Sequence, residues 1–101
     1  MNKNLLAQVK KMQDEMAKAQ EELAATVVTG TAAGGAITVN ATCDQRVKSI
    51  VISKDAVDVD DLEMLEDLIV VAVNDALAKA SETQQQRMAA VTGNIRIPGI
   101  M

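Results

Sequence analysis

The amino-acid sequence predicts a single α+β domain over residues 1–101, an α-β-β-β-α subunit in which two long helices flank a three-stranded antiparallel sheet. Two observations lead to this fold class. Apolar residues recur with heptad spacing in residues 2–24, and a long run without Gly or Pro ends at about residue 91, whereas the middle third is rich in β-branched residues that alternate with polar ones. A chain of 101 residues is long enough for one domain and too short for two.

The first helix is predicted over residues 2–24. Its apolar residues are spaced alternately four and three positions apart, which is the a/d spacing of a heptad repeat. They are Leu5, Val9, Met12, Met16, Ala19 and Leu23. A stripe this narrow needs another helix against it. The pattern fits a helix of the same domain and a helix of a second subunit about equally well.

Three short strands are predicted in the middle of the chain. Residues 26–29 are β-branched, and Ile37–Thr42 alternates apolar and polar residues, so one face of that strand is expected to be buried. Residues 47–53 follow, and their centre is apolar on both faces. Because the connections are short, these strands are expected to form an antiparallel meander.

Glycines at positions 30, 34 and 35 lie between the first two predicted strands. A glycine-rich segment could cradle a phosphate, but these residues lack the following Lys-Ser/Thr of a P-loop and do not open a helix. A hairpin turn that begins at Gly30 is therefore favoured.

The second helix is predicted from the acidic segment around Asp60 to about residue 91. Asp60 and Glu63 have capping-box spacing, and further carboxylates suit the positive end of the helix dipole. The same carboxylates could bind a divalent cation, but the EF-hand spacing is absent, so capping is favoured. One stretch is apolar all round and is expected to lie partly against a second copy of the chain. This predicted homodimer interface comprises Leu68, Ile69, Val70, Val71, Ala72 and Val73.

The composition argues against several classes of protein. The chain has no histidine, and its one cysteine, Cys43, can form no intrachain disulfide, which fits a reducing cytosol. Without a histidine to activate it, Cys43 is interpreted as a small apolar residue rather than a nucleophile. No apolar run approaches the roughly 20 residues of a membrane span. With no nucleophile–base pair and no metal-ligand set, no enzyme activity, cofactor or small-molecule substrate is expected.

Charge is unevenly distributed along the chain. Residues 1–20 contain four lysines and two carboxylates, whereas residues 44–75 contain nine carboxylates and three cations. Helices about 35 and 45 Å long must extend beyond strands of about 20 Å. The extending parts, residues 1–15 and about 80–101, are basic.

These basic ends have two interpretations. They could be cationic arms that contact the phosphates of double-stranded DNA. They could instead be ordinary solvated helix faces, and composition alone slightly favours this second interpretation. The absence of aromatic residues argues against single-stranded nucleic acid. The candidate phosphate contacts, chosen from charge placement, are Lys3, Lys10, Lys11, Lys18, Lys79, Arg87 and Arg96.

Two segments of the second helix carry a resemblance: Glu-Met-Leu-Glu-Asp-Leu-Ile at 63–69 and Ala-Val-Asn-Asp-Ala at 72–76. They closely resemble the YbaB/EbfC family of bacterial nucleoid-associated proteins. Segments along nearly the whole chain agree in order and spacing, including Met12-Gln13, Val28-Thr29-Gly30, Gly34-Gly35, Ile50-Val51-Ile52, Glu82-Thr83-Gln84 and Pro98-Gly99.

The resemblance implies a tweezers-like homodimer with helical arms, and DNA binding linked to chromosome organisation and gene regulation. It also implies a cytoplasmic protein associated with the nucleoid. A different class of function stays open beside it. The acidic middle of the chain, or the apolar residues at its end, could serve a protein-interaction or scaffolding module with little intrinsic DNA binding.

Overall fold

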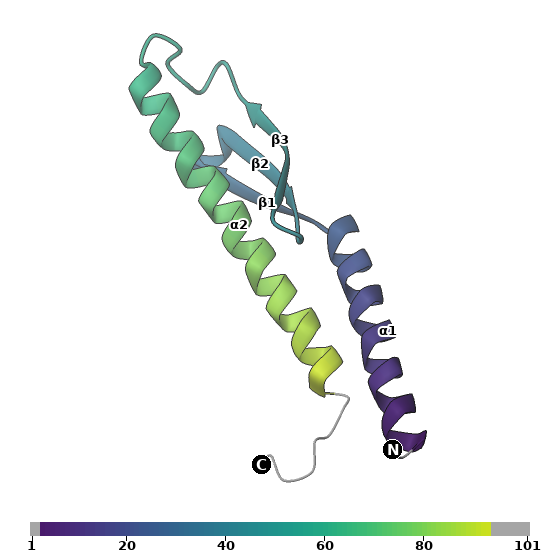
Figure 1. Ribbon diagram of the computed structural model, residues 1–101. Helices are drawn as coiled ribbons and strands as arrows, with labels where there is room; N and C mark the ends of the chain where they lie inside the picture. The colour runs from purple at the N-terminus through teal and green to yellow at the C-terminus, as the bar shows by residue number, and fades with distance from the viewer. Residues whose placement is uncertain (1–2, 94–101) are drawn as a thin grey trace.

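The computed structural model describes residues 3–93, and its elements follow the predicted α-β-β-β-α order (Figure 1). They are α1 (Lys3–Ala25), β1 (Val27–Ala32), the short 3₁₀ turn η1 (Ala33–Gly35), β2 (Ile37–Thr42), β3 (Arg46–Ile52) and α2 (Leu62–Gly93). The predicted fold class is confirmed. Of the candidate residues, only Arg96 lies outside the described residues.

The sheet is antiparallel in the order β1-β2-β3, and α2 lies across one of its faces over β1 and β2 (Figure 1). The alternation in β2 places Ile37, Val39 and Ala41 on this face, where all three are fully buried. Ala72 and Ala76 of α2 complete the same core cluster. The apolar residues of the predicted alternation in β2 are therefore the ones that form the core of the subunit.

Gly30 lies inside β1 and not in a turn, which corrects the sequence-based expectation. A Cβ at this position would lie 2.3 Å from the backbone N of Ala76 and 2.4 Å from the backbone O of Ala72. The absence of a side chain lets α2 cross β1 at backbone contact, and so β1 continues through Gly30 to Ala32.

The second core cluster joins α1 to the end of the sheet. It contains Cys43, Leu23 and Ala80, and the Cys43 side chain is fully buried. The Cys43 N–H donates to the backbone oxygens of Leu23 and Thr26, at 3.0 Å each. Cys43 thus fills space at the junction of three elements, in agreement with its interpretation as a small apolar residue.

Both helices extend beyond the sheet in the same direction (Figure 1). We call these extensions, the N-terminal part of α1 and the C-terminal half of α2, the arms. The sheet and the N-terminal half of α2 together are called the body. In the apolar stripe of α1, Ala19 and Leu23 at the C-terminal end are buried. Met12 and Met16 are half-buried, and Val9 is exposed. The stripe therefore packs within its own subunit near the body and is uncovered toward the N-terminus.

Carboxylates do cap α2, but the cap is Asp61 rather than Asp60. The Asp61 Oδ1 accepts a hydrogen bond of 3.1 Å from the N–H of Met64, three residues further along the chain. The Asp58 Oδ1 accepts one of 2.9 Å from the N–H of Asp60.

Within residues 3–93, no group of three or more His, Cys, Asp or Glu is placed to hold a metal ion. In the same part of the chain, no helix is long and apolar enough to cross a membrane.

Candidate nucleic-acid interface

The four lysines of α1 share one face of the helix. A helix turns by about 100° per residue, and at this pitch Lys3, Lys10, Lys11 and Lys18 fall within about 100° of arc. The apolar stripe of α1 lies on the opposite side. All four lysines are exposed, and we call this surface the lysine face. Because the stripe packs toward α2 near the body, the lysine face points away from α2.

The lysine face is open to a partner. Among the residues that the structure describes, no ion pair holds any of its four ammonium groups. By the same helical geometry Asp14 and Glu21 also lie on this side, so its charge is reduced but stays positive. This arrangement suits contacts with a polyanion whose charges are spaced along a line.

Arg87, in contrast, is already paired within the subunit. Its Nε donates to the Glu22 Oε2 at 2.8 Å and so joins α2 to α1. The Arg87 hydrogen bond and charge lower the pKa of Glu22, and Glu22 raises the pKa of Arg87. The pair holds the two helices together where they leave the body.

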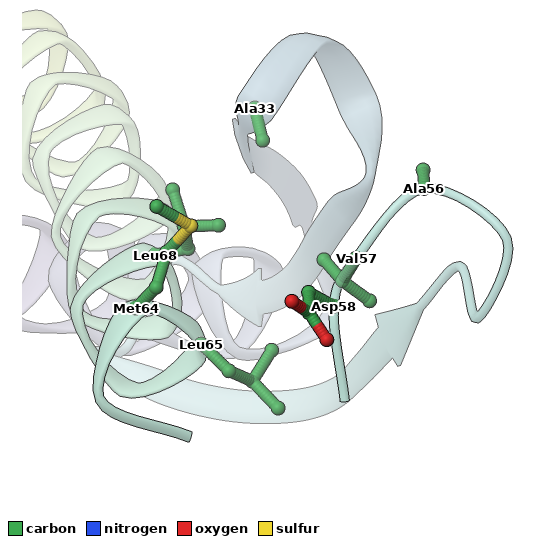
Figure 2. Close-up of a pocket in the computed structure, with 7 residues that line it drawn as sticks. All are labelled: Ala33, Ala56, Val57, Asp58, Met64, Leu65 and Leu68. Carbon is green, nitrogen blue, oxygen red and sulfur yellow. The ribbon is translucent and has the colours of Figure 1, made fainter. Parts of the chain in front are cut away.

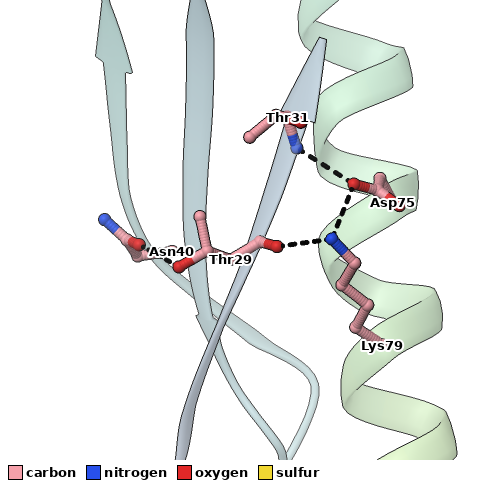
Figure 3. A network of polar contacts seen from close by, with 5 residues as sticks. All are labelled: Thr29, Thr31, Asn40, Asp75 and Lys79. Atoms are coloured by element: carbon pink, nitrogen blue, oxygen red, sulfur yellow. Dashed lines mark hydrogen bonds and ion pairs between the residues drawn. The ribbon is translucent and has the colours of Figure 1, made fainter. Parts of the chain in front are cut away.

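Lys79 is also paired, and it lies beside the sheet rather than on an arm. Its Nζ donates to the backbone O of Thr29 at 2.9 Å and to the Asp75 Oδ2 at 3.2 Å (Figure 3). The same Asp75 oxygen accepts from the N–H of Thr31 at 3.0 Å. Asp75 and Lys79 therefore satisfy backbone groups along the outer edge of β1, which an edge strand would otherwise present to other chains.

The Asp75 contacts predict an acid-dependent loss of stability. The Thr31 hydrogen bond, followed by that of Lys79, lowers the pKa of Asp75 below its usual 3.8. A lowered pKa contributes stability that is complete above the unfolded-state pKa and is lost as the pH falls through the folded-state pKa. Urea unfolding of wild type and Asp75→Asn should therefore differ most at neutral pH and converge below about pH 4. A difference that stays constant as the pH falls well below that value would show that the ionised carboxylate contributes nothing.

The six residues proposed for the dimer interface divide into two groups. Ala72 is fully buried in the subunit, and Leu68, Ile69 and Val73 are partly buried against its core. Val70 and Val71 are 56% and 54% exposed. Only these last two project substantially from the subunit.

Val70 lies on the flank of α2 that faces β3. Round the helix axis, Val70 is about 140° from Asp75 and about 180° from Lys79. Asp75 and Lys79 border β1 on the opposite flank. Val71 lies much closer to Asp75 on the helix surface. The two exposed valines therefore point to different sides of the body.

The strand β3 carries apolar residues that α2 does not cover. Val47 and Ile50 pair with Ala41 and Val39 of β2, so they lie on the face that α2 buries over the other strands. Val47 is 42% exposed and Ile50 44%. We call Val47, Ile50 and Val70 the β3 strip. Sequence reasoning did not select its β3 members, although the doubly apolar centre of this strand was the signal.

Comparison with known proteins identifies the family. The model of the YbaB/EbfC DNA-binding family matches residues 1–95. The chain belongs to the YbaB/EbfC DNA-binding family. The family predicted from sequence resemblance is therefore confirmed.

Curated relatives in the YbaB/EbfC family are similar over almost their whole length. A protein of Chloroflexus aurantiacus named nucleoid-associated protein is 52% identical over 97 residues, covering 95% of this chain and 97% of its own. A protein of Pelotomaculum thermopropionicum with the same name is 46% identical over 96 residues, covering 95% of this chain and 91% of its own.

A solved structure shares the fold. The crystal structure of an uncharacterized protein from Helicobacter pylori superposes with a TM-score of 0.79 at 19% sequence identity. The match covers 92% of this chain and 99% of that one. The fold is thus preserved where little sequence similarity remains.

Proposed function

We propose that the protein is a cytoplasmic, nucleoid-associated protein that binds double-stranded DNA as a homodimer, without catalysis and without a cofactor. Its role is in chromosome organisation and gene regulation. Membership of a DNA-binding family and the names of the curated relatives support this proposal.

The lysine face is the observation that carries the proposal. It places four cations along one arm, on the side of α1 that points away from the protein. Contacts from lysine to phosphate are largely indifferent to base sequence and are weakened by salt. The chain has no aromatic residue to stack on unpaired bases, which favours a duplex over a single strand.

The β3 strip supports the homodimer. A monomer would leave three apolar side chains exposed: Val47 and Ile50 on the sheet face next to the core, and Val70 on the flank of α2 toward β3. A second copy packed on this strip would remove them from water, at about 25 cal/mol for each Å² of apolar surface buried. Val71 would lie outside this contact.

Replacing Val70 with Asp is expected to give a soluble monomer. Val70 is exposed in the isolated subunit, so the fold should survive, whereas an unpaired carboxylate buried in the dimer costs several kcal/mol. Light scattering at micromolar concentration should show a dimer for wild type and a monomer for the variant. Val71→Asp, the same substitution at a position that is 54% exposed and lies outside this contact, is the matched control. A monomeric wild type would exclude the proposed dimer.

A gel-shift titration of the full chain on long duplex DNA, repeated over a salt series, tests the function. Binding should weaken steadily with salt and should not depend on the sequence of the duplex. Absence of binding at low salt, together with salt-insensitive capture of a protein, would favour the scaffolding module instead.

A further inference from the structure

An apolar pocket lies at the end of the body, remote from the arms. It has a volume of about 240 Å³ and is larger than the roughly 150 Å³ engineered cavity known to bind benzene. Met64, Leu65 and Leu68 of α2 form one side, and Val57 and Ala33 face them across the opening (Figure 2). By helical geometry this surface lies on the β1 flank of α2, so it is separate from the β3 strip.

The surroundings of this pocket are strongly acidic. Asp58 lines it, and further carboxylates lie in the same loop and in the first turn of α2, whereas the loop, residues 53–61, contains one cation, Lys54. These exposed carboxylates are Asp55, Asp60, Asp61 and Glu63. A nucleic acid would be repelled here. The pocket instead suits a peptide with aliphatic side chains and a positive charge.

The chain itself contains a segment of that kind. Residues 95–101 carry Ile95, Ile97 and Ile100 around Arg96, and no carboxylate side chain follows Glu82 in the sequence. We propose that residues 95–101 of a second molecule dock in this pocket, with an isoleucine in the cavity and Arg96 beside the carboxylates.

The segment cannot reach the pocket of its own molecule. Leu68 and Gly93 are separated by about 37 Å of helix. The chain from Gly93 to Met101 spans at most about 29 Å even when fully extended. The contact therefore joins the body of one molecule to the arm end of the next. A contact between two different surfaces can repeat without closing, so it would line molecules up along DNA. This inference goes beyond DNA binding and does not require it.

Binding of a labelled peptide tests the docking without DNA. A fluorescent peptide of residues 93–101 is titrated with the full-length protein, and its anisotropy is followed. Met64→Lys places a positive charge at the pocket, on an exposed position near the start of α2, where it removes an apolar contact and repels Arg96; it should weaken binding by about tenfold or more. Ala78→Lys adds the same charge at an exposed position further along α2, and should change binding less than about twofold. A peptide carrying Arg96→Glu should also bind more weakly than the wild-type peptide.

Three results would overturn the proposal. They are no binding of the wild-type peptide, equal binding by the Met64→Lys protein, and an equal decrease in both protein variants. Circular dichroism should show the same helix content in both variants, which separates damage to the site from damage to the fold. Because the assay contains no DNA, failure here leaves the proposed DNA binding untouched, and failure of DNA binding leaves this test valid.

Discussion

Changing Lys10 and Lys11 together to Glu is expected to weaken binding to every DNA duplex by about one to two orders of magnitude at low salt. Both side chains lie on the lysine face, and no ion pair in the described part of the chain involves them. The salt dependence should also flatten, by about 0.9 in the log–log slope for each phosphate that the variant no longer neutralises. Exposed helix positions tolerate such changes, so the fold and the dimer should persist.

The matched control reverses two charges on the body. Lys48→Glu with Lys54→Glu changes the net charge by the same amount, at exposed positions on β3 and in the loop that follows it, far from the N-terminal part of α1. Gel shifts on two unrelated duplexes over one salt series would compare the variants. If the body variant abolished binding while the arm variant did not, DNA would bind a surface other than the lysine face.

Two further candidates, Lys79 and Arg87, carry the right charge but already have partners. Sequence reasoning grouped them with the lysines of α1, since all are cations near the basic ends. The structure gives Lys79 a partner on β1 and gives Arg87 a partner on α1, 50 and 65 positions away along the chain. Local spacing could not reveal these two pairs. The second partner of Lys79, Asp75, lies four residues before it on α2, and that spacing was a signal in the sequence. Both residues stay candidates, but removing either also breaks an intramolecular hydrogen bond.

Most of the fold could be predicted because each element has a local signal. Heptad spacing located α1, a capping signal followed by a long run without Gly or Pro located α2, and alternation located the buried face of β2. The cap of α2 was expected one residue too early, because several carboxylates are adjacent there and the spacing of Asp60 and Glu63 matched a known motif. The structure shows that Asp61 makes the bond. Boundaries within such a cluster depend on backbone geometry that composition does not specify.

Gly30 was misplaced for a different physical reason. Glycine is frequent in turns, and two more glycines follow within five positions, so the local pattern favoured a hairpin. Its true role depends on α2, more than forty residues later, whose backbone meets β1 at this point. A glycine required for close approach and a glycine required for a turn look the same in one sequence.

Gly30→Ala is expected to be the most destabilising Gly→Ala change among the glycines that the structure describes. The new Cβ would lie under 2.5 Å from two backbone atoms of α2, the N of Ala76 and the O of Ala72. Backbone atoms within a helix cannot rotate away as the end of a side chain can. Relief therefore requires α2 to move off β1, which would loosen its packing against Ile37 and Val39.

The expected cost is about 3 kcal/mol or more, at the upper end of overpacking substitutions. For a domain of this size, 3 kcal/mol lowers Tm by roughly 12 °C or more. Gly93→Ala is the control, because a Cβ there meets nothing within 4 Å. Thermal unfolding followed by circular dichroism, at one protein concentration so that dimerisation does not differ, should separate the two variants. Equal Tm values would mean that α2 can withdraw from β1 at little cost, and that Gly30 does not set the distance between them.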